Sequence, residues 1–118
     1  MLFLLLLASL AGNWKFTVDL SDGSRGTPSF MLQQNGGRLT GTYHGPLGER
    51  TVTGTAEGER VAFSFEFERG GSTGKAVYEG KIEGPTHMSG TVKFVSGSET
   101  RMTGNWAATK AEPSTPRK

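Results

Sequence analysis

The sequence predicts an all-β protein, an eight-stranded antiparallel up-and-down β-barrel, on three observations. After Gly12, apolar and polar residues alternate with a period of two, which is the strand signature. No stretch of ten or more residues shows helical spacing. The 118 residues include 18 glycines, and these lie in the turns between alternating segments or inside the segments themselves. A two-sheet β-sandwich made from the same strands is the alternative.

Three of the predicted strands show plain alternation. The first, residues 13–19, places Trp14, Phe16 and Val18 on one face. The second, residues 28–34, ends at Asn35-Gly36-Gly37, which predicts a tight hairpin because Asn and Gly accept positive φ. The fifth, residues 60–68, opposes valine and three phenylalanines to alanine, serine and glutamates, and is the clearest amphipathic strand.

The other five strands share a unit in which glycine lies between two apolar residues on the same face. Glycine inside a strand weakens it, so its repeated use requires a physical reason. We expect these glycines to face the barrel interior, where they permit sharp coiling and make room for bulky neighbours. The unit occurs at residues 39–43, 52–56, 78–82, 88–92 and 102–106, within predicted strands 38–44, 50–56, 75–82, 88–95 and 100–108.

Charge and patterning exclude two classes of partner. The formal net charge of +2 arises in the last nine residues, because residues 12–109 carry ten basic and ten acidic side chains. Nucleic-acid binding normally requires a basic patch, so we expect no nucleic-acid partner. We also expect no membrane span, because the polar faces of the strands carry Thr, Lys, Glu and Arg, whereas a membrane barrel turns an apolar face outward.

The two ends of the chain differ from the middle in composition. Residues 1–11 form an apolar run ending in small residues, typical of an export signal or a truncated one, with cleavage expected after Ala11. A first strand or a mis-set start is the alternative interpretation of this run. Residues 110–118 contain two prolines and no large apolar residue, and are expected to be disordered. The predicted barrel domain is therefore residues 12–109, in a secreted or periplasmic protein without cysteine.

The tripeptide Gly-Asn-Trp occurs at both ends of the predicted barrel. Gly12 and Trp14 begin the first strand, and Gly104 and Trp106 lie in the last. Closure would make these strands neighbours, with both indoles inward and plugging one end of the barrel. Arg101 or Lys110 is expected to stack on an indole.

A Gly-x-Trp in the first strand resembles the opening motif of the calycin superfamily, which includes lipocalins, fatty-acid-binding proteins and avidins. The avidin-like group looks nearest, because it has eight strands and a segment similar to residues 39–43. The resemblance implies a ligand-binding barrel. Phe16 stands where avidins have a biotin-binding Asn, so biotin binding is not expected, and only Tyr43 carries over as a ligand hydroxyl.

Large apolar side chains on the inward face form the candidate ligand site. An eight-stranded barrel is just wide enough either to fill itself or to hold one small ligand. The first hypothesis is therefore a secreted module that binds a small apolar or aromatic ligand. The alternative is a filled domain that acts through its loops on a secreted protein partner. The candidate lining residues are Tyr43, Phe63, Phe65, Tyr78, Phe94 and Met102.

The sequence contains no recognisable catalytic arrangement. His44 and His87 are the only histidines, and each is predicted to lie at a strand end, where an exposed position is the simplest interpretation. Pairing with Glu49 or Glu83 is the functional alternative. There is no HExxH motif, phosphate loop or nucleophile elbow. We therefore expect neither enzymatic activity nor a cofactor or metal.

Overall fold

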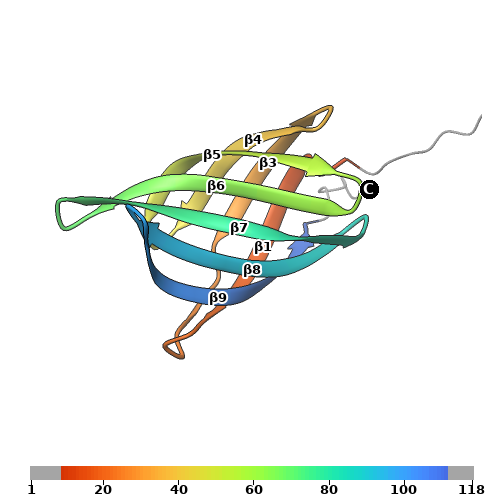
Figure 1. Ribbon diagram of the computed structural model, residues 1–118. Helices are drawn as coiled ribbons and strands as arrows, with labels where there is room; N and C mark the ends of the chain where they lie inside the picture. Colours follow the sequence, from red (N-terminus) through yellow and green to blue (C-terminus); the bar gives the residue numbers. More distant parts are fainter. Residues whose placement is uncertain (1–8, 112–118) are drawn as a thin grey trace, which may run out of the picture.

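The computed structural model describes residues 9–111 and shows a closed antiparallel β-barrel (Figure 1). Consecutive long strands pair with each other, and β1 also pairs with β9, which closes the sheet. This closure confirms the predicted eight-stranded barrel and excludes the sandwich. The strands are β1 (Gly12–Leu20), β2 (Arg25–Gly26), β3 (Ser29–Asn35), β4 (Arg38–Gly45), β5 (Gly48–Glu57), β6 (Arg60–Arg69), β7 (Ser72–Gly84), β8 (His87–Ser96) and β9 (Glu99–Lys110).

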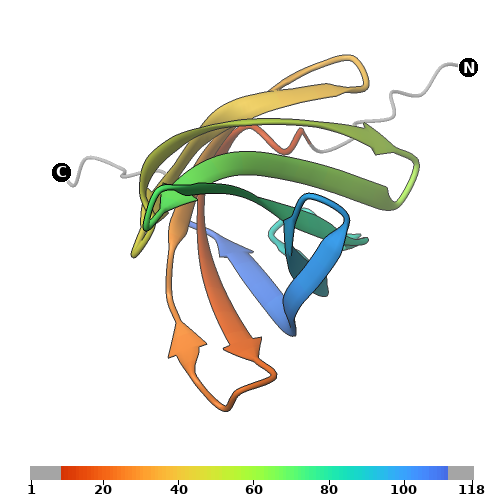
Figure 2. The same cartoon turned by 60° about the vertical axis from the view of Figure 1, so that its left-hand side comes forward.

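One short strand was not predicted. The first two predicted strands, residues 13–19 and 28–34, leave the residues between them outside any strand, but β2 pairs with the end of β1 at Val18 and Asp19. The Arg25 Nε atom lies 2.7 Å from the Asp19 Oδ1 atom and holds the two segments together at the surface. Figure 2 shows this part of the chain projecting away from the rest of the barrel.

Both ends of the chain extend further into the fold than the alternation suggested. β9 continues through Lys110, which was expected in the tail, and Ala111 N–H donates a hydrogen bond to the Asn13 carbonyl. At the other end, Leu10 packs in the core with 2% of its surface exposed. The rest of the expected export signal, residues 1–8, and of the expected tail, residues 112–118, lie outside the described residues.

Glycine in the repeated five-residue unit lets neighbouring strands approach very closely. At each of the five positions, a Cβ atom would overlap backbone of an adjacent strand. At Gly90, for example, it would meet the Glu79 carbonyl and the Cα atom of Gly80. Tight strand coiling in the closed barrel therefore depends on the missing side chain. The five glycines are Gly41, Gly54, Gly80, Gly90 and Gly104.

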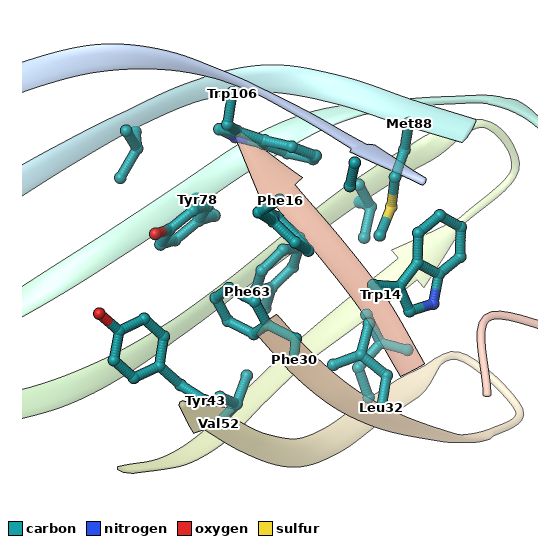
Figure 3. Packing of buried hydrophobic residues seen from close by; sticks show 14 of the residues in the cluster. Trp14, Phe16, Phe30, Leu32, Tyr43, Val52, Phe63, Tyr78, Met88 and Trp106 are labelled. Atoms are coloured by element: carbon teal, nitrogen blue, oxygen red, sulfur yellow. The ribbon is translucent and has the colours of Figure 1, made fainter. Parts of the chain in front are cut away.

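Aromatic side chains fill the middle of the barrel (Figure 3). Phe16 contacts Phe30 with ring centroids 4.3 Å apart and stacks on Trp106 at 5.0 Å. Phe63 stacks on Tyr78 at 5.2 Å with nearly parallel rings. The described residues have no buried side-chain polar atom without a hydrogen-bond partner. This packed aromatic layer divides the interior into two ends.

Trp14 and Trp106 lie on the paired strands β1 and β9, and both are buried. Because the strands run antiparallel, Trp14 faces Lys110 and Trp106 faces Val18, so the indoles lie at different heights. Trp14 closes the end of the barrel at which β1 begins and β9 ends, hereafter the terminal end, and Trp106 lies in the aromatic layer.

One of the two indoles, that of Trp14, has a cationic neighbour that the sequence predicted. The Lys110 Nζ atom lies 5.7 Å from the centroid of the Trp14 ring, whereas Arg101 pairs with Glu99. Gly104 pairs with Leu20 across the closure. Gly12 pairs instead with Leu32 of β3, although a Cβ atom there would approach Lys110 Cε at 3.0 Å. Only Trp14 therefore acts as an end plug.

Candidate functional site

The end of the barrel opposite the terminal end contains a cavity of about 450 Å³, hereafter the open cavity. Its volume falls within the range of small-molecule pockets, roughly 300–1,000 Å³. The last residues of β1, the β4–β5 turn, the segment before β3 and the ends of β6, β7, β8 and β9 next to their hairpin turns surround it. The lining residues are Val18, Leu20, Gly26, Pro28, Tyr43, Pro46, Leu47, Phe67, Ser72, Thr73, Gly74, Tyr78, Phe94, Val95, Ser96, Arg101 and Met102.

Four of the six predicted site residues line this cavity. Tyr43 comes from β4, Tyr78 from β7, Phe94 from β8 and Met102 from β9. Phe94 and Met102 face each other across the β8–β9 ladder, and both are only partly buried. Apolar surface that is left partly exposed inside a concave site is the usual environment for an apolar ligand.

Phe63 and Phe65, the other two predicted site residues, support the tyrosines from behind. Phe65 stacks on Tyr43 with ring centroids 4.1 Å apart, and Phe63 stacks on Tyr78. Both phenylalanines are 2% exposed and do not line the open cavity. Strand alternation places them on the inner face, but the stagger of the closed barrel puts them in its packed half.

Several lining residues were absent from the predicted site. Phe67 was placed on the inward face of its strand but was not named as a site residue. Of the three phenylalanines on that face, it is the one that lines the cavity. Leu20, Pro28 and Leu47 lie in or beside connections, where periodicity gives no signal. The one available signal was Leu47 itself, a large apolar residue in a short hairpin turn.

The open cavity is almost free of charge. Arg101 is the one charged residue among the described side chains that line it, and the Arg101 Nη2 atom lies 3.4 Å from the Glu99 Oε1 atom. Both side chains are about two-thirds exposed, so the pair lies at the rim. The lining also includes two phenols, Tyr43 and Tyr78, whose hydroxyls point to the same side, away from Trp14 (Figure 3). The interior therefore favours a molecule without full charge.

Burial sets the protonation of both phenols. Desolvation raises the pKa of Tyr78 well above its ordinary value, and the nearby Tyr43 adds to the increase. Desolvation also raises the pKa of Tyr43, while the Leu47 N–H, 3.4 Å from its oxygen, and the charge of Arg50 act in the opposite direction. Both side chains are therefore neutral hydroxyls at physiological pH.

The raised pKa of Tyr78 predicts a loss of stability in alkaline solution. The unfolded chain releases this proton near pH 10, before the folded chain does, so the stabilisation is complete below pH 10 and is lost as pH rises toward the folded pKa. Its loss amounts to at most about 1.4 kcal/mol per pH unit. Urea unfolding between pH 8 and pH 11 should show a smaller decline for Tyr78→Phe than for the wild type. Equal declines would contradict the prediction.

The histidines lie outside this site. The His44 Nε2 atom is 3.9 Å from the Glu49 Oε2 atom, with both side chains more than half exposed. His87 Nδ1 lies 3.3 Å from the Thr86 hydroxyl at the surface. Within residues 9–111 no group of three or more His, Asp or Glu side chains is placed to hold a metal ion. The described part of the chain also has no helix long and apolar enough to cross a bilayer.

Comparisons with known proteins identify the fold and not a family. No protein-family model and no curated protein matches the sequence. Among solved structures, the chain is similar to a redesigned β-barrel, b11L5F_LGL, with a TM-score of 0.70 and 14% identity over 87% of this chain and 92% of the other. It is also similar to the redesigned barrel mFAP0 bound to DFHBI, with a TM-score of 0.65 and 17% identity over 86% and 98%. The fold and the site thus define a closed β-barrel with a ligand-sized cavity at one end.

Proposed function

We propose that this protein is a calycin-like binding module that holds one small apolar or aromatic molecule in the open cavity. The observation that carries the proposal is the cavity of about 450 Å³, lined by aromatic and aliphatic side chains and nearly without charge. Burial of apolar ligand surface against Phe67, Phe94 and Met102 would supply the binding free energy, at about 25 cal/mol per Å². Small-molecule binding is also named for a barrel of similar fold, mFAP0 bound to DFHBI.

The alternative is a filled barrel that acts through its loops. Only the terminal end of the barrel is filled in the way that this alternative requires. There the side chains of Trp14, Leu32 and Leu39 are almost fully buried. At the other end, a filled barrel would not be expected to leave Phe94 and Met102 partly exposed around so large a space. This contrast favours ligand binding over a purely structural role.

Export from the cytoplasm is a further part of the proposal and rests on the apolar run in residues 1–11. A ligand carrier with an accessible cavity suits a secreted or periplasmic location. Expression of the full chain with a C-terminal tag, followed by fractionation and N-terminal sequencing of the tagged protein, tests this part. Recovery of unprocessed protein from the cytoplasm alone would contradict it.

Titration with the fluorescent apolar probe N-phenyl-1-naphthylamine tests the binding proposal. We expect a saturable increase in emission with a dissociation constant in the micromolar range, about 8 kcal/mol of binding free energy. Met102→Glu places a carboxylate inside the cavity and should weaken binding at least about tenfold, because the probe would leave that charge poorly solvated.

Thr103→Glu is the matched control for this substitution. Thr103 is the next residue of β9 and lies on the exposed outer face, so the same charge is added outside the barrel. We expect its affinity for the probe to equal that of the wild type. Absence of binding by the wild type, or equal affinities for all three proteins, would overturn the proposed function.

A further inference from the structure

The hydroxyl of Tyr78 is an uncommitted donor inside the open cavity. Only 2% of the Tyr78 side chain is exposed, and the residue lines the cavity. Among the side chains that the structure describes, none forms a hydrogen bond with the Tyr78 oxygen. Every fully buried polar side-chain atom in this part of the chain does have a partner, so the Tyr78 oxygen retains some accessible surface. The Tyr78 hydroxyl therefore faces the cavity with its proton available to a ligand.

The surrounding rings fix the position of the Tyr78 oxygen. Phe63 stacks on the Tyr78 ring with an interplanar angle of 10°, and Phe30 packs edge-on with ring centroids 5.3 Å apart. These contacts leave the ring little freedom to turn its oxygen elsewhere. A donor held in one orientation before binding loses less entropy when a ligand engages it.

The other hydroxyl in the cavity, that of Tyr43, is in a different state. Its oxygen accepts a hydrogen bond from the Leu47 N–H at 3.4 Å, which ties it to the β4–β5 turn. It lies beside Tyr78 in the same cavity and on a similarly buried ring. Accepting this bond leaves the Tyr43 proton free, so the difference from Tyr78 is that the Tyr43 oxygen is held at the β4–β5 turn. Tyr43 therefore provides a matched comparison for Tyr78, with the same chemical group in the same cavity.

Resting on the proposed function, we propose that Tyr78 donates a hydrogen bond to a neutral carbonyl oxygen at the buried end of an aromatic ligand. A carbonyl provides the acceptor that the Tyr78 hydroxyl lacks, and its aromatic part fits the apolar walls. A carboxylate suits the site less, because Arg101, the charged residue among the described lining side chains, lies at the rim beside Glu99. The ligand class is thus an aromatic ketone, aldehyde or lactone that enters carbonyl first.

Two ligands of nearly equal shape test this assignment: 2-acetylnaphthalene and 2-ethylnaphthalene, which differ by a carbonyl in place of a methylene. Their affinities are measured by displacement of N-phenyl-1-naphthylamine from the wild type, Tyr78→Phe and Tyr43→Phe. Tyr78→Phe should weaken 2-acetylnaphthalene binding about tenfold, because one hydrogen bond is lost. It should leave 2-ethylnaphthalene unchanged or bound more tightly, because no donor remains unpaired beside the hydrocarbon.

Three other results would each overturn a different part of the argument. Equal changes for the two ligands in Tyr78→Phe would overturn the proposed donor role while the proposed function stands. A loss of ketone selectivity in Tyr43→Phe as large as that in Tyr78→Phe would overturn the assignment to Tyr78. Failure of the wild type to bind the probe or either ligand would refute the proposed function itself. Retained binding of 2-ethylnaphthalene by Tyr78→Phe also shows that the variant is folded.

Discussion

Gly80→Ala should lower the free energy of unfolding by about 3 kcal/mol, at the upper end of the usual cost of overpacking a core. A Cβ atom at Gly80 of β7 would overlap the Ser89 carbonyl of β8 and lie 2.7 Å from Cζ2 of Trp106. The Ser89 carbonyl belongs to the paired strand and has little room to move. The Trp106 indole is also held, because its Nε1 donates a hydrogen bond to the Thr91 carbonyl at 2.8 Å.

Gly84→Ala provides the control in the same strand. A Cβ atom at Gly84 would meet no heavy atom within 4 Å, and the residue has no positive φ. Both substitutions remove the same amount of backbone freedom from the unfolded chain, so this contribution cancels in their comparison. Gly84→Ala should leave the stability unchanged or raise it by up to about 1 kcal/mol.

Urea unfolding of the two variants and the wild type, followed by tryptophan fluorescence, measures the difference. If Gly80→Ala proves as stable as Gly84→Ala, the close approach of β7 and β8 at Gly80 is not required for closure. A folded Gly80→Ala with displaced strands would show altered emission, since Trp106 lies directly against the substituted position. The pair of variants therefore tests the role assigned to glycine in the repeated unit at the position where β7 and β8 approach most closely to Trp106.

The same glycines show why the barrel could be predicted from sequence. Alternation in residues such as Trp14, Phe16 and Val18 defines which face is buried, because the strand period depends only on backbone geometry. Glycine on that face, as at Gly41 and Gly90, indicates sharply coiled strands. Both signals are local, so they can be recognised in the sequence without knowledge of tertiary contacts.

The location of the cavity could not be predicted in the same way. Phe63, Phe65 and Phe67 share one face of β6, yet only Phe67 lines the open cavity. Height along the barrel axis depends on strand tilt and on the stagger between neighbouring strands, which the alternation of a single strand does not specify. Strand β2 also depends on a tertiary contact. Its two residues form a strand only because they pair with β1, and a segment of two residues shows no alternation.

The packing of Leu10 was hidden by the composition around it. Residues 1–11 form one apolar run, and nothing in that run distinguishes a residue of the barrel core from a residue of an export signal. In the structure the Leu10 carbonyl accepts a hydrogen bond from Trp14 Nε1 at 2.9 Å, and the Leu10 N–H donates one to Gln34 Oε1 at 2.8 Å. Cleavage after Ala11, as expected from the sequence, would therefore remove Leu10 and both of these hydrogen bonds from the barrel.

A chain that begins at Gly12 should accordingly be less stable than one that begins at Ser9, by about 3 kcal/mol. Burial of one leucine side chain contributes roughly 1.5–3 kcal/mol, and the hydrogen bond to the Trp14 indole adds about 1 kcal/mol. The shorter chain also loses the bond from Lys110 Nζ to the Ser9 carbonyl, at 2.8 Å, which contributes little at the surface. Urea unfolding of the two purified chains measures the difference.

Leu10→Ala in the longer chain separates the side chain from the backbone. It keeps the carbonyl that Trp14 contacts and removes most of the buried leucine surface, so its cost should be about 2 kcal/mol and smaller than that of the truncation. Trp14 emission should shift to longer wavelength in the chain that begins at Gly12, because water then reaches the indole. Equal stability of the two chains, with unchanged emission, would mean that Trp14 alone seals the terminal end and that loss of Leu10 leaves the barrel intact.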